Sequence, residues 1–231
     1  IIMKIHRFLY PYPVEGSTHS LTDSDIVHQI TRVLRLEQDE TIELFDGEGT
    51  VHIAQIRELN KKEVTVEILN TLHKEKPSRK VALFISILKK ENTEIAIEKA
   101  VEIGAGEIVP IITSRTIKVG IKTERIESII KEATEQSGRS YMPTFRDTMT
   151  FEDALEYGKS HFSRVVIFDP RGTPFFAKEE NSVAVFIGPE GGFTDQELEL
   201  AREKNCEITS LPTHILRGET AAIIGVYSAL L

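Results

Sequence analysis

The chain has 231 residues, of which 40% are hydrophobic and 28% are charged, a composition typical of a globular protein that excludes a disordered or fibrous chain. Its formal net charge of -8 excludes binding to nucleic acid by bulk positive charge, so any contact with RNA has to depend on local basic patches. No apolar run approaches the roughly 20 residues that cross a bilayer, and we expect no membrane partner.

The start of the chain and its cysteine content favour the cytoplasm. Residues 1–7 lack the basic-then-apolar order of a signal peptide. Cys206 is the single cysteine of the sequence and cannot form an intramolecular disulfide, which fits a reducing compartment. Because Cys206 lies near the apolar Ile208 in the approach to a predicted strand, we interpret it as a small buried side chain and not as a reactive thiol. We therefore expect a cytoplasmic protein.

The first 71 residues have the pattern of a small β domain. Strands are predicted at 41–45, 50–56 and 64–69, separated by turns that contain Gly, Asp, Asn and Lys. In the third strand the apolar residues alternate with polar ones, which is typical of a half-buried antiparallel sheet.

An amphipathic helix is predicted before these strands, with Asp23 among its capping residues. Four apolar residues are expected on one face of this helix: Ile26, Ile30, Val33 and Leu34. Three basic residues lie on it or at its end: His28, Arg32 and Arg35. Taken alone, these basic residues fit a solvated helix face better than a binding site.

Residues 72–79 are polar and basic and contain Pro77, which predicts a linker. Beyond the linker the strands become continuous apolar runs. We expect strands at 81–88, 108–112, 165–168 and 183–187, and helices at 93–103, 122–137 and 151–157, the last capped by Thr150. Because strands alternate with helices, residues 80–231 are predicted to form an α/β domain with a mostly parallel sheet.

A glycine-rich corner follows the predicted strand that ends at Ile187. It reads Gly188-Pro-Glu-Gly-Gly-Phe193, and its glycines let the main chain turn sharply and approach a ligand closely. Thr194 and Glu197 have the spacing of a capping box, so a helix should begin directly after the corner. Ligands of parallel α/β sheets bind at the carboxyl ends of strands, which makes this corner a candidate pocket wall. Taken alone, the same sequence fits a tight connection equally well.

A second strand-exit loop, at residues 211–222, leads into the terminal helix that ends at Leu231. It reads Leu-Pro-Thr-His-Ile-Leu-Arg-Gly-Glu-Thr-Ala-Ala. The two loops in this order resemble the α/β-knot (SPOUT) RNA methyltransferases, in particular the bacterial 16S ribosomal RNA uridine-N3 methyltransferase family, whose pattern joins Gly-Pro-Glu-Gly-Gly to Leu-Arg-x-Glu-Thr-Ala. Three upstream elements match the same family, so that the resemblance covers the whole chain: the segment 28–35, Lys99-x-x-Glu102-x-Gly104 and Glu135-Gln-Ser-x-Arg139.

The resemblance implies a fold and a set of partners. The expected fold is α/β, with a carboxyl-terminal α/β trefoil-knot (SPOUT) domain at residues 80–231 preceded by a small PUA-like RNA-binding β-barrel at residues 1–71. The residues implied in RNA binding are Arg7, His28, Arg32, Arg35 and Arg139. The implied partners are 16S ribosomal RNA, within the assembled small subunit, and a second copy of the chain, since family members are homodimers. The apolar terminal helix can supply a dimer face, although core packing explains its composition equally well.

The resemblance also implies that S-adenosylmethionine is the cofactor, bound in a bent form among three strand-exit loops. The implied cofactor-binding residues are Phe168, Asp169, Ile187, Gly188, Pro189, Gly191, Gly192, Leu211, Pro212, Ile215 and Leu216. Apolar side chains among them, with adjacent main-chain groups, suit a flat adenine ring.

The implied reaction transfers a methyl group to N3 of a specific uridine. Since N3 carries a proton, the site needs a group that stabilises the uracil anion and a proton acceptor. Arg217 is the candidate for the first catalytic role, and Glu219 or a water molecule for the second. Glu219 is also explained as a carboxylate that favours the dipole of its own helix.

Two positions depart from the family pattern. Pro212 replaces a usual glycine and removes a backbone donor, and Gly218 replaces a usual threonine just before Glu219.

Other functions remain open from the sequence. The chain could methylate another RNA or a ribose 2′-hydroxyl, or be a non-catalytic RNA-binding assembly factor of the ribosome. A metal site has little support, because the histidines are scattered and no Cys-x-x-Cys or His-Glu-x-x-His motif occurs.

Overall fold

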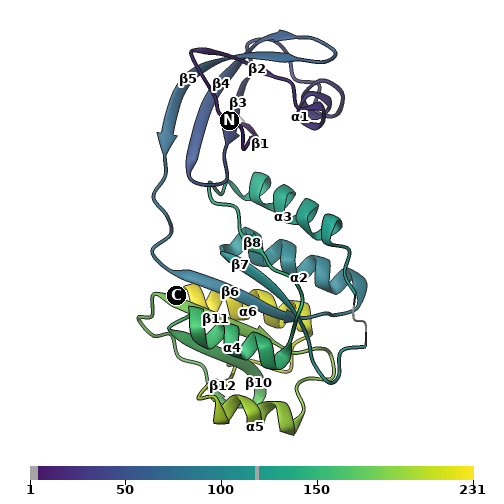
Figure 1. Cartoon of the computed structure of the whole chain (residues 1–231), viewed down its shortest axis with the longest axis vertical. Coiled ribbons are helices and arrows are strands. Elements are labelled where there is room, and N and C mark those ends of the chain that lie inside the picture. Colours follow the sequence, from purple (N-terminus) through teal and green to yellow (C-terminus); the bar gives the residue numbers. More distant parts are fainter. Residues whose placement is uncertain (1–4, 118–119) are drawn as a thin grey trace. The chain divides into compact units, whose positions relative to one another are not determined.

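A computed structural model describes residues 5–117 and 120–231, which fold into two compact units (Figure 1). The first unit contains the described residues up to Lys76 together with the distant stretch Thr134–Met142. The second unit contains Pro77–Ala133 and Pro143–Leu231. Within the first unit, Glu135 of the distant stretch accepts a hydrogen bond of 2.9 Å from the backbone amide of Leu9.

The first unit contains a five-stranded sheet. Its order is β1 (His6–Leu9), β3 (Thr41–Phe45), β4 (Thr50–Leu59), β5 (Val64–His73) and β2 (Thr18–Leu21), and β1–β3 is its parallel pair among the described strands. The three predicted strands are confirmed. However, β4 and β5 are longer than predicted, and β5 extends through the first two residues that the sequence assigned to the linker.

The predicted amphipathic helix is present but changes its geometry halfway. It begins as α1 (Ser24–His28), and Asp23 caps it by accepting from two backbone amides at 3.0 Å. It continues as a π-helical turn, η1 (Gln29–Val33). The wider turn breaks the spacing of an α-helix, so the prediction that Val33 and Leu34 lie on the buried face is wrong: Val33 is 62% exposed and Leu34 37%.

The second unit contains a sheet whose described pairings are all parallel, which confirms the predicted mostly parallel sheet. The strand order is β12 (Glu207–Ser210), β10 (Arg164–Pro174), β11 (Ser182–Ile187), β6 (Lys80–Ser86), β7 (Glu107–Ile112) and β8 (Thr144–Phe145), and β9 (Met149–Thr150) also pairs with β7. The sequence did not predict β8 and β9, since two residues are too few to show a pattern.

Helices cover both faces of this sheet (Figure 1). On one face, α4 (Phe151–His161) places Phe151 against the stacked rings of Phe84 and Phe186, whose centroids are 4.3 Å apart. On the other face, α6 (Gly218–Leu230) packs on Phe168 and beside α2 (Lys90–Ile103). The remaining helices are α3 (Thr123–Ser137) and α5 (Asp195–Glu203). Within the described chain, no helix is both long and apolar enough to cross a bilayer.

A crevice is expected at the carboxyl ends of β6 and β11, which are neighbours in the sheet. After β6 the chain enters α2, and after β11 it enters α5. The cluster that includes Phe84, Phe186 and Leu198 places α5 on the α4 face, whereas α2 packs beside α6. Loops that leave neighbouring strands towards opposite faces leave space between them for a ligand.

The strand β10 is interrupted by a bulge. Both Phe168 and Thr173 pair with Thr209 of β12, so residues 169–172 loop out of the sheet. The chain then returns towards the start of the same strand, because Arg164 donates a hydrogen bond of 3.1 Å to the carbonyl oxygen of Phe176. Within the described range 120–231, no helix lies between β10 and β11, whereas the sequence predicted that strands alternate with helices.

A buried carboxylate, Glu107, lies at the start of β7 and is 1% exposed. It accepts hydrogen bonds from the Tyr157 hydroxyl at 2.6 Å and from Arg146 at 2.9 Å, and its other oxygen lies 2.7 Å from the Lys80 ammonium. Burial alone would raise the pKa of Glu107, but the hydrogen bonds from Lys80, Tyr157 and Arg146 outweigh it and hold the pKa below its ordinary value.

We expect the Glu107→Gln variant to lose about 2 kcal/mol of unfolding free energy at pH 7, since a buried acceptor for charged donors is replaced. Because the folded pKa is depressed below the ordinary value of 4.5, the carboxylate stabilises the fold above that pH and loses its contribution as pH falls through the folded pKa. Denaturant unfolding at pH 7 and in acid measures the difference, which should shrink in acid. The exposed Glu199→Gln is the control, and an equal loss for Glu107→Gln at both pH values would contradict this account.

Candidate active site

A cavity of about 730 Å³ lies at the carboxyl ends of β10, β11 and β12. These strands are parallel neighbours, so their exit loops meet at one edge of the sheet. Its walls come from the bulge after Phe168, the glycine-rich loop after Ile187 and the loop between β12 and α6. Lys89 and Asn92, at the start of α2, and Arg115, in the loop that follows β7, add a further wall.

The structure brings together nearly all the residues that the sequence assigned to cofactor binding. The cavity is lined by Phe168, Asp169, Ile187, Gly188, Pro189, Gly191, Gly192, Leu211, Ile215 and Leu216. Pro212 is exposed and is absent from the lining, so the loss of a backbone donor there does not face the cavity. The glycine-rich loop and the loop between β12 and α6, whose sequences together indicated the family, thus line one cavity.

The glycine-rich loop is packed tightly at its start and capped at its end. A Cβ atom at Gly188 would lie 3.1 Å from the buried ring of Phe193, so a side chain there would displace that ring. The capping box is confirmed: Thr194 accepts from the Glu197 amide at 3.2 Å, and Glu197 accepts from the Thr194 amide at 2.7 Å. Of the loop's three glycines, Gly192 has a left-handed backbone, with a φ of 67°.

Arg171, which was not among the residues predicted from the sequence, lines the cavity beside Asp169. Its Nε and Nη2 atoms donate to the two carboxylate oxygens of Asp169 at 2.7 and 2.8 Å. Burial would raise the pKa of Asp169, but these hydrogen bonds lower it below the ordinary value. A signal was present in the sequence, since Arg171 follows a predicted strand within the same short loop as Asp169.

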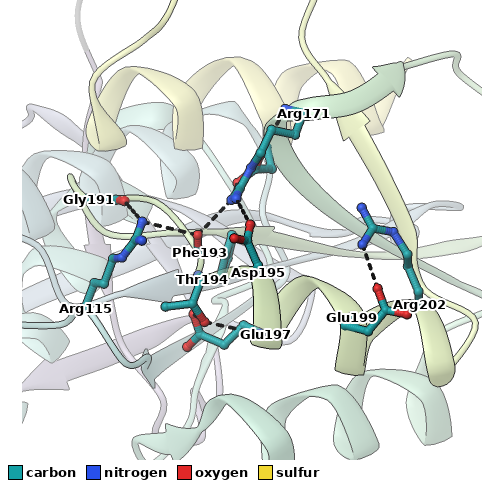
Figure 2. A network of polar contacts seen from close by, with 10 residues as sticks. Arg115, Arg171, Gly191, Phe193, Thr194, Asp195, Glu197, Glu199 and Arg202 are labelled. Atoms are coloured by element: carbon teal, nitrogen blue, oxygen red, sulfur yellow. Dashed lines mark hydrogen bonds and ion pairs between the residues drawn. The ribbon is translucent and has the colours of Figure 1, made fainter.

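Arg115 was missed as well, and no local pattern could have found it. It follows β7 but donates a hydrogen bond of 2.6 Å to the carbonyl oxygen of Gly191, which lies 76 residues further along the chain (Figure 2). The side chain also packs over Gly191, where an added Cβ would lie 3.3 Å from its Cδ atom. Arg115 thus braces the glycine-rich loop.

Arg217 and Glu219 both line the cavity at the start of α6. Arg217 is the N-cap residue and its side chain makes no capping hydrogen bond. Glu219 lies in the first turn, where the helix dipole favours a carboxylate, and its Oε2 atom is buried without a hydrogen-bond partner among the described residues. A cation and a carboxylate in one cavity can stabilise a developing anion and accept a proton.

Gly218, between these two residues, is fitted to its surroundings. A Cβ atom at this position would lie 2.9 Å from both methyl groups of Leu88. Contacts below 3.0 Å force a neighbour to move, so a threonine here would require Leu88 to shift. The departure from the family pattern at Gly218 is therefore matched by the packing of this chain.

The residues predicted to bind RNA have different environments within the first unit. His28, Arg32 and Arg35 are exposed on and just after the segment formed by α1 and η1. Arg7 is largely enclosed, with an ion pair of 2.6 Å to Glu43. Arg139 is half-buried, and burial lowers the pKa of its guanidinium to about 10. RNA contacts by these residues stay predictions.

Among the described residues, no group of three or more His, Cys, Asp or Glu side chains is arranged to hold a metal ion. The candidate site consists of the cavity-lining side chains and main chain described above.

Comparison with known proteins agrees with this fold. Residues 74–229 match the RNA methyltransferase domain family, and residues 21–69 match the RNA methyltransferase PUA domain family. The chain is 32% identical to the ribosomal RNA small subunit methyltransferase E of Rickettsia conorii over 97% of this chain and 94% of that protein. It is 27% identical to the protein of the same name from Aquifex aeolicus, over 98% and 99% of the two chains.

A solved structure supports the same assignment. The crystal structure of ribosomal RNA small subunit methyltransferase E from Neisseria gonorrhoeae, bound to S-adenosyl methionine, has a TM-score of 0.88 and 30% sequence identity to this protein. The alignment covers 96% of this chain and 95% of that one. The predicted fold class, a PUA-like domain followed by an α/β-knot domain, is confirmed. The chain therefore belongs to the family of RNA methyltransferases that includes the bacterial small-subunit ribosomal RNA methyltransferases E.

Proposed function

We propose that this protein is an S-adenosylmethionine-dependent methyltransferase that methylates N3 of a specific uridine in the 16S ribosomal RNA of the small subunit. The observation that carries the proposal is that Arg217 and Glu219 line the same cavity as the glycine-rich loop after β11. The names of its relatives support small-subunit ribosomal RNA as the substrate, and the S-adenosyl methionine bound in the Neisseria structure supports the cofactor.

The cavity fits the cofactor in size and in lining. Its volume of about 730 Å³ lies within the range of small-molecule sites. Ile187, Leu211 and Leu216 would enclose the adenine ring, and the adjacent main chain would supply hydrogen-bonding groups at its edge. Bound there, S-adenosylmethionine supplies a methyl group from its sulfonium centre.

Arg217 and Glu219 would act on the uracil. Arg217 would donate to O2 or O4 and stabilise the negative charge that develops when N3 loses its proton. The unpartnered Oε2 atom of Glu219 would accept that proton, directly or through water. The lone pair left on N3 would then form the new bond to the methyl carbon as the bond from that carbon to the sulfonium sulfur breaks. The electron pair of the broken bond would stay on the sulfur, so S-adenosylhomocysteine would leave and Arg217 would release the neutral methylated base.

We further propose roles for the two parts of the chain and for a second copy of it. Residues 1–71 would bind RNA through the exposed side chains on α1 and η1, and residues 80–231 would carry out the transfer. A homodimer is supported by the exposed apolar residues of α6 and the chain end, where Tyr227 is 53% and Leu231 70% exposed. The substrate would be the assembled small subunit in the cytoplasm.

Mapping reverse-transcription stops in 16S ribosomal RNA tests the proposal. A strain that lacks this protein should lose one stop caused by N3-methyluridine, and expression of the protein should restore it. Retention of every modified uridine would reject the assignment. A lost site that instead resists alkaline cleavage would indicate a ribose 2′-O-methyltransferase. Calorimetry with S-adenosylmethionine separates both enzymes from a non-catalytic assembly factor, which would show no binding.

A further inference from the structure

We propose that Arg171, anchored by Asp169, is a positioning residue that holds the glycine-rich loop in the conformation that receives S-adenosylmethionine. This inference rests on the proposed function, because it assigns how the same cavity is kept in shape. Arg171 comes from the bulge in β10, whereas the glycine-rich loop follows β11, so the contact joins two of the three cofactor loops.

Arg171 is held by several hydrogen bonds at once (Figure 2). The backbone amide and Nε of Arg171 donate to Asp169 Oδ1 at 3.0 and 2.7 Å, and Nη2 donates to Oδ2 at 2.8 Å. The same Nη2 atom donates to the carbonyl oxygen of Phe193 at 2.7 Å. Because the guanidinium is planar and its donors have fixed directions, fixing it on Asp169 also fixes its direction towards Phe193.

Phe193 is the residue of the glycine-rich loop that Arg171 contacts. Its ring is fully buried in the core, and its centroid lies 5.3 Å from the ring centroid of Phe151, so its side chain cannot shift freely. Its carbonyl oxygen is approached from two directions, by Arg171 at 2.7 Å and by Arg115 at 3.4 Å (Figure 2). The last residue of the loop is thus fixed both by its ring and by its backbone.

Glu197 completes the support from a third direction. It is buried, and its Oε2 atom accepts from the Thr194 amide at 2.7 Å while its Oε1 atom accepts from the Ser114 amide at 2.7 Å. The loop after β7, the bulge in β10 and the first turn of α5 therefore converge on Phe193, which ends the glycine-rich loop, and on Thr194, which caps α5. Tight support of this kind keeps a binding site in its productive geometry before the ligand arrives.

This arrangement changes the interpretation of Asp169. Its side chain is 2% exposed, and both of its oxygen atoms accept hydrogen bonds from Arg171. The contact of Arg171 with Asp195 matters less, since the Asp195 side chain is 96% exposed and water competes for such ion pairs. We infer that Asp169 affects cofactor binding through Arg171 and not through a separate contact with the cofactor.

The first test compares the Kd for S-adenosylmethionine of the full-length Arg171→Ala variant with that of the wild type by calorimetry. Loss of the contact between Arg171 and Phe193 should raise this Kd about tenfold or more, because small displacements of the loop in a preorganised site weaken binding strongly. The KM for S-adenosylmethionine should rise with the Kd, while kcat at saturating cofactor stays within about threefold. Arg202→Ala is the matched control, since Arg202 pairs with Glu199 on the surface of α5 and should leave Kd unchanged (Figure 2).

A double-mutant cycle with Asp169→Asn tests the anchoring. If Asp169 acts through Arg171, the double variant should bind about as weakly as Arg171→Ala alone. Additive losses would overturn this part, because they would show a separate contribution from Asp169. Arg171→Lys serves if the alanine variant does not fold: lysine keeps the charge but cannot reproduce the planar fork, so binding should still weaken.

The outcomes separate the two proposals. A wild-type protein that does not bind S-adenosylmethionine would reject the proposed function itself. A wild type that binds, with both Arg171 variants within twofold of its Kd, would overturn the positioning role alone. A lower kcat with unchanged Kd would also overturn it, because that result indicates loss of active enzyme and not loss of loop geometry.

Discussion

Replacing Arg217 by alanine is expected to lower kcat by about two to three orders of magnitude, as removal of a transition-state donor does in other enzymes. The residue lies at the N-cap of α6 in the wall of the cavity, and its side chain does not cap the helix, so its removal leaves the helix start intact. In the proposed mechanism, its interaction with the uracil would grow only as N3 loses its proton. The Kd for S-adenosylmethionine should therefore change little. Single-turnover methylation of the small subunit and calorimetry measure the two quantities separately.

Two further variants define what Arg217 contributes. Arg217→Lys keeps the positive charge but loses the planar fork, so it should recover part of the lost rate. Arg202→Ala removes an arginine from an exposed ion pair on α5 and should leave kcat unchanged. A kcat for Arg217→Ala close to that of the wild type would exclude a catalytic role, and a large increase in the Kd would assign the residue to cofactor binding instead.

The Gly172→Ala variant is expected to lower the free energy of unfolding by about 2 to 3 kcal/mol, the upper part of the usual range for an overpacked site. A Cβ atom at Gly172 would lie 2.5 Å from the amide nitrogen of Thr209 and 2.6 Å from the carbonyl of Ile208. These neighbours are backbone atoms of β12, which cannot rotate away as a flexible side chain can. The variant must therefore separate β10 from β12 or distort the bulge.

Gly120→Ala is the matched control for this change, because a Cβ atom at Gly120 would have no neighbour within 4 Å among the described residues. Both variants make the same chemical replacement, so the conformational entropy of the unfolded chain changes alike. Urea denaturation followed by circular dichroism gives the two free energies. Equal stability of the two variants would mean that the bulge can relax at little cost. The Gly172→Ala variant should also bind S-adenosylmethionine more weakly, since Asp169 and Arg171 lie in the same bulge.

The local features of the site could be predicted because each depends on residues close together in sequence. The capping box joins Thr194 to Glu197, three positions away, and the geometry of a helix start follows from this spacing alone. The strand before the glycine-rich loop was recognisable as a short apolar run, and it became β11 with almost the predicted bounds. Cys206 is buried as expected, and burial raises the pKa of its thiol.

Errors arose where tertiary packing changed the local geometry. The apolar pattern placed Val33 and Leu34 on a buried helix face, but the π-helical turn exposes them and Leu36 is buried in their place. Pro212 belongs to a loop whose neighbours line the cavity, but it is absent from the lining, and its contact with the cofactor stays a prediction. The sequence of a loop does not predict which of its residues line a cavity, since that depends on how the loop is packed.

By itself, the sequence of this protein determined the order of its longer strands and helices, the glycine-rich corner, the capped helix after it and, through resemblance, the family. Only the tertiary structure decided that Arg115 and Arg171 meet at the carbonyl of Phe193, and that Asp169 is bound to Arg171. The physical reason is the order of the strands in the sheet. Parallel pairing brings the exits of β7, β10 and β11 towards one end of the sheet, although these strands are far apart in the chain.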